Sequence, residues 1–177
     1  MFRFPYLKEG NTPEKVNQFR QLLKDHNYLN GHVTIDASDW YIESRMKKFL
    51  RKDSTGGIEG YKKYYLDHIF DRANYYEKMS FEMTGRHIPH TLLLHHNLVS
   101  ALFLDDLIAL FEKKGWEIID AEKAYQDEIF KQLNPSFPPG ESLIWSMANQ
   151  LETHCSNLRY PAEDGRYEKP KMDLLGL

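Results

Sequence analysis

Apolar and polar residues alternate with helical spacing in three parts of the chain. The Thr-Pro-Glu sequence at 12–14 is a typical helix start, and apolar residues then recur at helical spacing to about Asn27. A second helical pattern covers residues 61–84, and a third covers residues 101–114. A glycine, which commonly ends a helix, follows each of these two patterns. The spacing therefore predicts helices over all three segments.

Short apolar runs lie between the helical segments and are typical of buried strands. Residues 31–36 are rich in β-branched side chains between turn residues, while residues 90–95 are too few for a separate helix. Residues 116–120 form another such run, and residues 1–6 are also strand-like. The alternation predicts an α/β fold with about four parallel strands, too few to close a barrel.

The chain changes character in its last third. Residues 134–140 are rich in Pro and Gly, one more helical pattern covers about 141–152, and a polar tail follows. We therefore expect one domain over residues 1–130 and a mostly irregular and helical C-terminal extension over residues 131–177.

Composition and charge narrow the classes of function. The 177 residues are 41% hydrophobic and 28% charged, as in ordinary globular proteins. A net charge of −3, from 23 basic and 26 acidic residues, indicates neither nucleic acid nor an anionic membrane as a partner. No apolar stretch approaches the roughly 20 residues of a membrane span and the sequence carries no secretory signal, so a cytoplasmic location is the provisional expectation. The single cysteine, Cys155, cannot form an internal disulfide, and we expect a packed small side chain there.

Polar residues stand at the carboxyl ends of the strand-like runs. Loops from neighbouring parallel strands converge at this edge, so side chains there can form one site. A histidine beside a carboxylate is a suitable general acid, because the carboxylate favours the imidazolium and fixes its tautomer. We expect a shared site formed by Arg3, Tyr6, Asp36, Asp39, His95 and Asp120.

Three of these segments, in this order, resemble motifs of the polysaccharide deacetylases, the nodulation protein B homology domain of carbohydrate esterase family four. Arg3-Phe-Pro-Tyr6 resembles the Arg-x-Pro-Tyr motif, Asp36-Ala-Ser-Asp39-Trp40 the Asp-x-x-Asp-Trp motif, and Leu92-Leu-Leu-His95 the Leu-x-Leu-His strand. The resemblance covers about residues 1–130. It implies part of a TIM-like (β/α) barrel of the deacetylase type, and a hydrolase that removes N-acetyl groups from amino-sugar polymers.

The resemblance also implies a role for each matching residue. His95 would be the general acid that protonates the leaving amine, and Asp39 the carboxylate that tunes it, with Asp36 left open as the alternative. Arg3 would position the catalytic base. The implied substrate-binding residues are Tyr6 and Trp40 in the sugar groove and Leu93 in the acetyl pocket.

The sequence departs from the family pattern at the metal site. The family holds a divalent metal, zinc or similar, through an Asp-Asp and a His-x-x-x-His motif that precede Arg-x-Pro-Tyr, where this sequence has only Met1 and Phe2. The remaining histidines have no ligand spacing, so we expect no metal ligand in this chain. We therefore expect the carboxyl-terminal part of a family domain, without a bound metal and inactive by itself.

Two other interpretations stay open. One is a non-catalytic remnant that binds carbohydrate or a protein partner, and the other is a generic α/β domain of unrelated function. The leading interpretation implies an N-acetylated amino-sugar polymer or oligosaccharide as the partner. An open sheet edge would also favour self-association.

Overall fold

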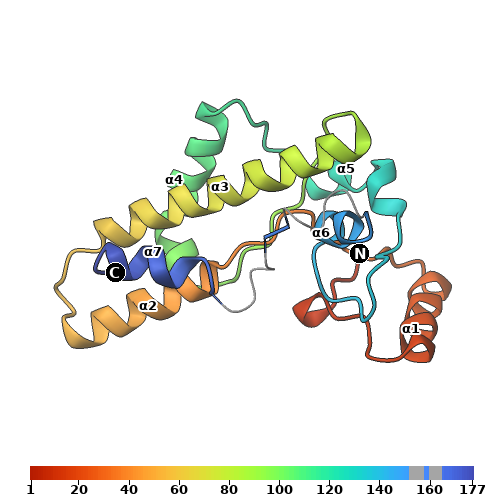
Figure 1. Ribbon diagram of the computed structural model, residues 1–177, viewed down its shortest axis with the longest axis horizontal. Coiled ribbons are helices and arrows are strands. Elements are labelled where there is room, and N and C mark those ends of the chain that lie inside the picture. The colour runs from red at the N-terminus through yellow and green to blue at the C-terminus, as the bar shows by residue number, and fades with distance from the viewer. Residues whose placement is uncertain (152–157, 160–164) are drawn as a thin grey trace. The chain divides into compact units, whose positions relative to one another are not determined.

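The structure is a computed structural model that describes residues 1–151, 158–159 and 165–177, and every regular element in these ranges is a helix (Figure 1). Cys155 and the end of the helix predicted over 141–152 lie outside the described residues. The α-helices are α1 (Pro13–Asp25), α2 (Asp39–Lys52), α3 (Glu59–Thr84), α4 (Leu98–Lys113), α5 (Ala121–Ala124), α6 (Leu143–Asn149) and α7 (Glu168–Leu174). Two short 3-10 helices are η1 (Pro5–Leu7) and η2 (Glu128–Lys131).

The predicted α/β fold, a partial TIM-like barrel with about four parallel strands, is wrong. Among the described residues, β-pairing is limited to two isolated parallel bridges, one between Phe2 and Asn30 and one between Ile35 and Leu92. These bridges do not extend into strands, so no sheet forms in the part of the chain that the structure describes. The architecture is helical.

Threonine side chains explain why two of the predicted strands do not form a ladder. The backbone N–H groups of Thr34 and Ile35 both donate to the carbonyl of Thr91, at 3.1 and 3.0 Å. In return, the Thr91 N–H donates to the hydroxyl oxygen of Thr34 at 2.7 Å, and the Thr91 hydroxyl donates to the His32 carbonyl at 2.8 Å. The segments lie side by side, but side chains take the bonds that a regular ladder would use.

The strand predicted over residues 116–120 is absent for a different reason. The Trp116 N–H donates to the carbonyl of Phe111 at 3.0 Å, and the two rings pack edge to face with centroids 5.4 Å apart. The segment therefore folds back onto the end of α4, and Ile118 is 54% exposed. An exposed run without a neighbouring strand does not extend a sheet.

The three helices predicted between residues 12 and 114 are confirmed, and α6 lies within the helical pattern over 141–152. Thr12 precedes α1 and its hydroxyl accepts the Lys15 N–H at 3.3 Å, while Gly85 follows α3 with a φ of 71°, the left-handed conformation that glycine tolerates. α4 begins at Leu98, earlier than the predicted start. α2 was not predicted, although Ile42 and Met46 are buried one turn apart on it.

The described chain divides into two compact units, and α3 contributes to both. Unit 1 consists of Met1–Ile35, Tyr76–Leu92 and Asp120–Arg159; unit 2 consists of Asp36–Tyr75, Leu93–Ile119 and Tyr160–Leu177. Within unit 2, α7 lies between α2 and the first part of α3 (Figure 1). The part predicted as a C-terminal extension, residues 131–177, thus contributes to both units.

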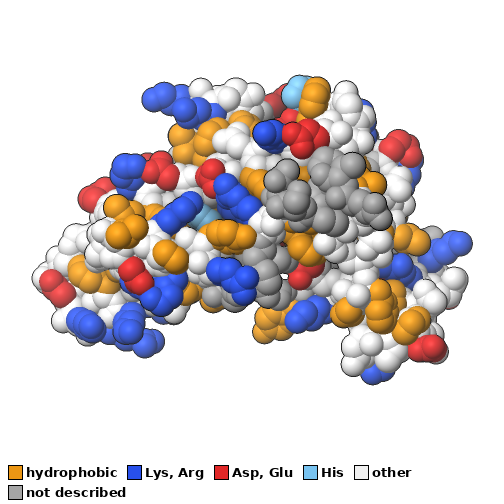
Figure 2. All heavy atoms as spheres, in the orientation of Figure 1, with side chains coloured by type: hydrophobic (Ala, Val, Ile, Leu, Met, Phe, Trp, Pro, Cys, Tyr) orange, Lys and Arg blue, Asp and Glu red, His pale blue; other side chains and the backbone are white. Residues whose placement is uncertain are grey.

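The surface carries charges of both signs. Figure 2 shows basic and acidic side chains interspersed with apolar ones on the visible face. Within the described ranges, no helix has the combination of length and apolar character that crossing a membrane requires.

Candidate acid–base site

Asp39 is the centre of a set of hydrogen bonds in unit 2. It is the first residue of α2, and its side chain is 0% exposed. Oδ1 accepts from Nδ1 of His95 at 2.7 Å, and Oδ2 accepts from the His95 backbone N–H at 2.8 Å and from Nδ2 of Asn97 at 2.7 Å. Both carboxylate oxygens are therefore held by N–H donors in fixed directions.

The start of α4 presents these donors to Asp39. Asn97 is the N-cap of α4, and its Oδ1 accepts the Ser100 N–H at 2.9 Å while its amide nitrogen donates to Asp39. One turn along α2, Glu43 Oε1 accepts the Leu98 N–H at 2.9 Å. Two carboxylates of α2 thus bind the N-terminal end of α4, where the helix dipole favours negative charge.

A buried layer lies beneath this polar contact. Ile42 and Met46 of α2 are fully buried, as is Val99 of α4, while Tyr65 of α3 packs its ring at 6.2 Å from that of Phe103. Burial raises the pKa of Tyr65, the charge on Asp39 adds to the rise, and Ser100 opposes it. The Tyr65 hydroxyl is therefore neutral at physiological pH.

His95 combines a fixed inner nitrogen with an open outer one. Its Nδ1 donates to Asp39, and 48% of its side chain is exposed. No described residue bonds its Nε2. In the neutral ring the Asp39 contact keeps the proton on Nδ1, which leaves Nε2 able to accept a proton and, once charged, to donate it.

The other predicted site residues that belong to unit 2 are close to this pair in the sequence. Trp40 follows Asp39 and is partly buried, with its ring edge-on to Tyr41 at 5.7 Å, and Leu93 is also partly buried. Asp36 was the open alternative to Asp39. Its backbone carbonyl accepts from Nε of the buried Arg72 at 3.3 Å, and the carboxylate bonded to His95 is that of Asp39.

Arg3 and Tyr6 belong to unit 1. Nε of Arg3 donates to the Gly31 carbonyl at 3.1 Å, and Nη2 donates to the Tyr125 hydroxyl oxygen at 3.2 Å. Tyr6 is 84% exposed and has a φ of 54°, which is unusual for a non-glycine residue. Asp120, which was also expected in the shared site, is the N-cap of α5 in unit 1.

A small polar cavity of about 10 Å³ lies beside Arg3 in unit 1. Glu9, Asn30 and His32 are among the residues that line it. The buried Glu9 carboxylate accepts from Arg20 Nε at 2.6 Å and from Asn30 at 3.1 Å. The space is of the order of one water molecule and is too small for a sugar ring.

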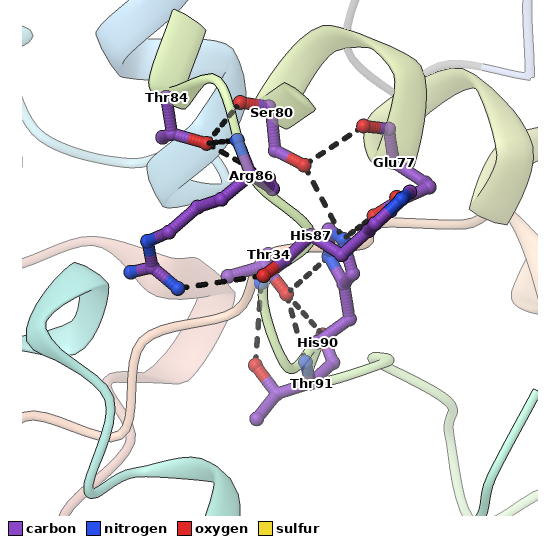
Figure 3. A network of polar contacts seen from close by, with 8 residues as sticks. All are labelled: Thr34, Glu77, Ser80, Thr84, Arg86, His87, His90 and Thr91. Atoms are coloured by element: carbon purple, nitrogen blue, oxygen red, sulfur yellow. Dashed lines mark hydrogen bonds and ion pairs between the residues drawn. The ribbon is translucent and has the colours of Figure 1, made fainter.

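Unit 1 contains a second group of histidines, shown in Figure 3. Nε2 of His90 lies 2.8 Å from Oε2 of Glu77, and its Nδ1 lies 3.1 Å from the Thr34 hydroxyl oxygen. The exposed His87 bonds the other oxygen of the same carboxylate. Burial lowers the pKa of His90, and the charge on Glu77 opposes the shift. The group connects α3 to the segment around Thr34.

The side chains do not fit the divalent metal that the family resemblance implies. The Asp39 oxygens are engaged by three N–H donors, and the Glu77 oxygens by His87 and His90. Across the residues that the structure describes, no group of three or more His, Cys, Asp or Glu side chains is arranged to hold a metal ion.

Three polar residues of unit 2 were missed by the sequence analysis. Ser38 precedes Asp39 and is fully buried, and its hydroxyl donates to Oε1 of Glu168 at 2.7 Å. Nε2 of His68 lies 3.2 Å from the same oxygen. Glu168 stands among charged residues in the sequence, so no hydropathy signal distinguished this buried residue from its exposed neighbours.

No family model matches the chain, and neither a curated protein nor a solved structure matches it.

Proposed function

We propose that this chain supplies a proton-transfer site of a polysaccharide deacetylase-like hydrolase that removes N-acetyl groups from amino-sugar polymers. The observation that carries the proposal is the contact between the buried Asp39 carboxylate and the half-exposed His95 imidazole. The order of the Arg-x-Pro-Tyr, Asp-x-x-Asp-Trp and Leu-x-Leu-His segments adds the substrate class.

The proposed step is protonation of the leaving amine. When the C–N bond of an N-acetyl group breaks, the departing nitrogen needs a proton, and the Nε2–H of His95 in its imidazolium form supplies it. Asp39 holds Nδ1–H throughout the step and stabilises the positive ring before transfer. Trp40 and Leu93, beside the pair in sequence, are the proposed contacts to the sugar ring and the acetyl group.

The chemistry proposed for this chain is limited to proton transfer. In the complete family domain, activation of water and polarisation of the amide carbonyl would come from a divalent metal. Because the described side chains do not fit that ion, we expect the 177-residue chain to release no acetate from acetylated chitooligosaccharides, with or without added zinc. Turnover that a chelator abolishes would contradict this expectation.

The substrate class is tested by NMR titration of the isotope-labelled chain with N-acetylated chitooligosaccharides. We expect saturable shifts of the His95 ring signals and of the Trp40 and Leu93 side chains. Cello-oligosaccharides have the same linkage but no acetamido group, and we expect no shifts from them. The exposed imidazole of His87 in unit 1 is the internal control. Equal responses to both sugars, or shifts confined to His87, would contradict the proposal.

A second candidate function is a non-catalytic carbohydrate-binding unit. The poor fit of the side chains to a metal ion favours it, because binding a sugar needs no activated water. It predicts that His95→Ala binds chitooligosaccharides as tightly as the unsubstituted chain. The proton-transfer proposal predicts weaker binding and loss of the shifts at Trp40, because the imidazole contacts the acetamido nitrogen.

A further inference from the structure

The bond between Ser38 and Glu168 replaces an ordinary helix cap. Ser38 is the N-cap of α2, a position where a serine hydroxyl usually accepts an N–H of the first turn. Here the side chain makes no capping bond and donates instead to Oε1 of Glu168 at 2.7 Å. The first residue after this unusual cap is Asp39, which binds His95.

The environment of Glu168 is unfavourable for a charged side chain. Its side chain is 2% exposed, and among the described residues its Oε2 has no hydrogen-bond partner. Burying a carboxylate with an unpaired oxygen destabilises a fold, and an apolar residue of similar size would pack there more favourably. Packing alone therefore does not account for a glutamate at this position.

Several contacts fix Glu168 within unit 2. Tyr64 of α3 stacks on His68 with ring centroids 5.8 Å apart, and its hydroxyl donates to the Glu168 carbonyl at 3.5 Å. Nε2 of His68 lies 3.2 Å from Glu168 Oε1, the oxygen that accepts from Ser38. Burial raises the pKa of Tyr64 and the charge on Glu168 adds to the rise, so this hydroxyl remains a neutral donor.

The rest of α7 is docked on α2 with equal specificity. Gly165, just before α7, faces the ring of Tyr41, and a Cβ at this position would clash with the ring. Met172 is fully buried, and Arg45 of α2 forms an ion pair with Asp173 at 2.8 Å. The segment that carries Glu168 is therefore held by several separate contacts, and loss of any one of them leaves the others in place.

We propose that Glu168 is a positioning residue for the Asp39–His95 pair, acting through Ser38 at the first turn of α2. The proposal deepens the proposed function and rests on it for its catalytic meaning. Asp39 must meet His95 within hydrogen-bond distance, and its backbone is the next peptide after Ser38. A hydroxyl anchored to a rigidly held carboxylate fixes that peptide, which a solvent-exposed cap would leave free to shift.

The test measures the tautomer of His95 by NMR of its ring nitrogens in the full chain. Glu168→Leu removes the acceptor but fills its volume, Ser38→Ala removes the donor, and Glu168→Gln keeps an acceptor oxygen. We expect the ratio of the Nδ1–H to the Nε2–H tautomer to fall about fivefold in Glu168→Leu and Ser38→Ala, because the bond to Asp39 weakens. Glu168→Gln should restore most of the ratio.

Asp173→Asn is the matched control, since it breaks the Arg45 ion pair of the same helix without touching Ser38. It should leave the tautomer ratio unchanged. An unchanged tautomer ratio in Ser38→Ala, or an equal change in Asp173→Asn, would overturn the proposal. If Glu168→Leu does not fold, the result for Ser38→Ala is used instead. The tautomer is read without turnover, so this result is separate from the chitooligosaccharide titration that tests the function.

Discussion

Each unit contains a histidine bonded to a carboxylate, but the burial of the two partners is reversed. In unit 2 the Asp39 side chain is 0% exposed and that of His95 is 48% exposed. In unit 1 the His90 side chain is 3% exposed and that of Glu77 is 22% exposed. The pair with the open imidazole can exchange a proton with a bound molecule, whereas the pair with the buried imidazole can only hold the fold together.

The second nitrogen of each ring supports the same distinction. Nδ1 of His90 lies against the Thr34 hydroxyl, so both of its nitrogens are used inside unit 1. Nε2 of His95 has no partner among the described residues. Two pairs with the same chemical groups therefore differ in the exposure of the imidazole, because the buried partner is the carboxylate in one and the histidine in the other.

The largest expected effect on stability comes from removing the buried carboxylate of the Asp39–His95 pair. Asp39→Ala leaves the His95 N–H, its ring Nδ1–H and the Asn97 amide without their acceptor, and we expect a loss of about 3 kcal/mol in the free energy of unfolding. Urea denaturation measures it. Glu43→Ala, which removes the acceptor of a single N–H one turn away, is the control and should cost about 1 kcal/mol. Equal losses of free energy of unfolding in the two variants would show that the three hydrogen bonds of Asp39 contribute no more to stability than the single bond of Glu43.

The next effect is the pH dependence of stability that comes from the Glu77–His90 pair. Because burial lowers the pKa of His90, the unfolded chain takes up a proton first as the pH falls below the ordinary value of 6.5, and stability declines from there toward the lower pKa of the folded state. His32 adds to this decline, since burial and Arg20 lower its pKa against the effect of Glu9. Well above pH 6.5 neither ring contributes, because both are neutral in both states.

The variant His90→Ala should show a smaller decline of stability on acidification, measured by urea denaturation at a series of pH values. Its stability at neutral pH should fall by about 2 kcal/mol, because Glu77 and Thr34 lose a buried partner. His96→Ala, at an exposed position next to His95, is the control for removing a histidine. If the pH dependence of stability were unchanged in His90→Ala, His90 would not be the buried structural imidazole that distinguishes its pair from the Asp39–His95 pair.

The smallest effect is expected at the open imidazole. His95→Ala removes a half-exposed ring and one hydrogen bond, so the free energy of unfolding should fall by less than about 1 kcal/mol. Thermal and urea denaturation, compared directly with His90→Ala, give the difference. A loss as large as that of His90→Ala would mean that His95 is also a structural residue.

The sequence was sufficient for elements whose signals are local. The cap at Thr12 and the apolar spacing that follows it predicted α1, and the long apolar stripe ended by Gly85 predicted α3. α2 was missed although Ile42 and Met46 carry a helical spacing, because the Asp-x-x-Asp-Trp segment that overlaps its start was interpreted as the polar carboxyl end of a strand.

The strands failed because strand formation depends on a partner. Residues 31–36 have β-branched side chains, yet the hydroxyls of Thr34 and Thr91 satisfy the backbone groups that would build a ladder. Which side chain takes which backbone group is decided by tertiary contacts between residues 57 positions apart. Hydropathy alone does not carry that information.

The candidate site was predictable in part. His95 after an apolar run and the Asp-x-x-Asp segment pointed to a histidine–carboxylate pair, but the choice between Asp36 and Asp39 required the structure. Glu168 could not be predicted, because it meets Ser38 from 130 positions away and lies in a polar segment. Buried charges brought in from distant segments leave no periodic signal.

The uncapped start of α2 also changes how strongly the last helix is held. A serine cap contributes about 1 kcal/mol to a helix. When α7 separates, Ser38 loses Glu168 but its hydroxyl becomes available to the first turn of α2, so part of the lost free energy is recovered. Docking and capping therefore compete for one hydroxyl group, and the docked arrangement is easier to reverse than its number of bonds suggests.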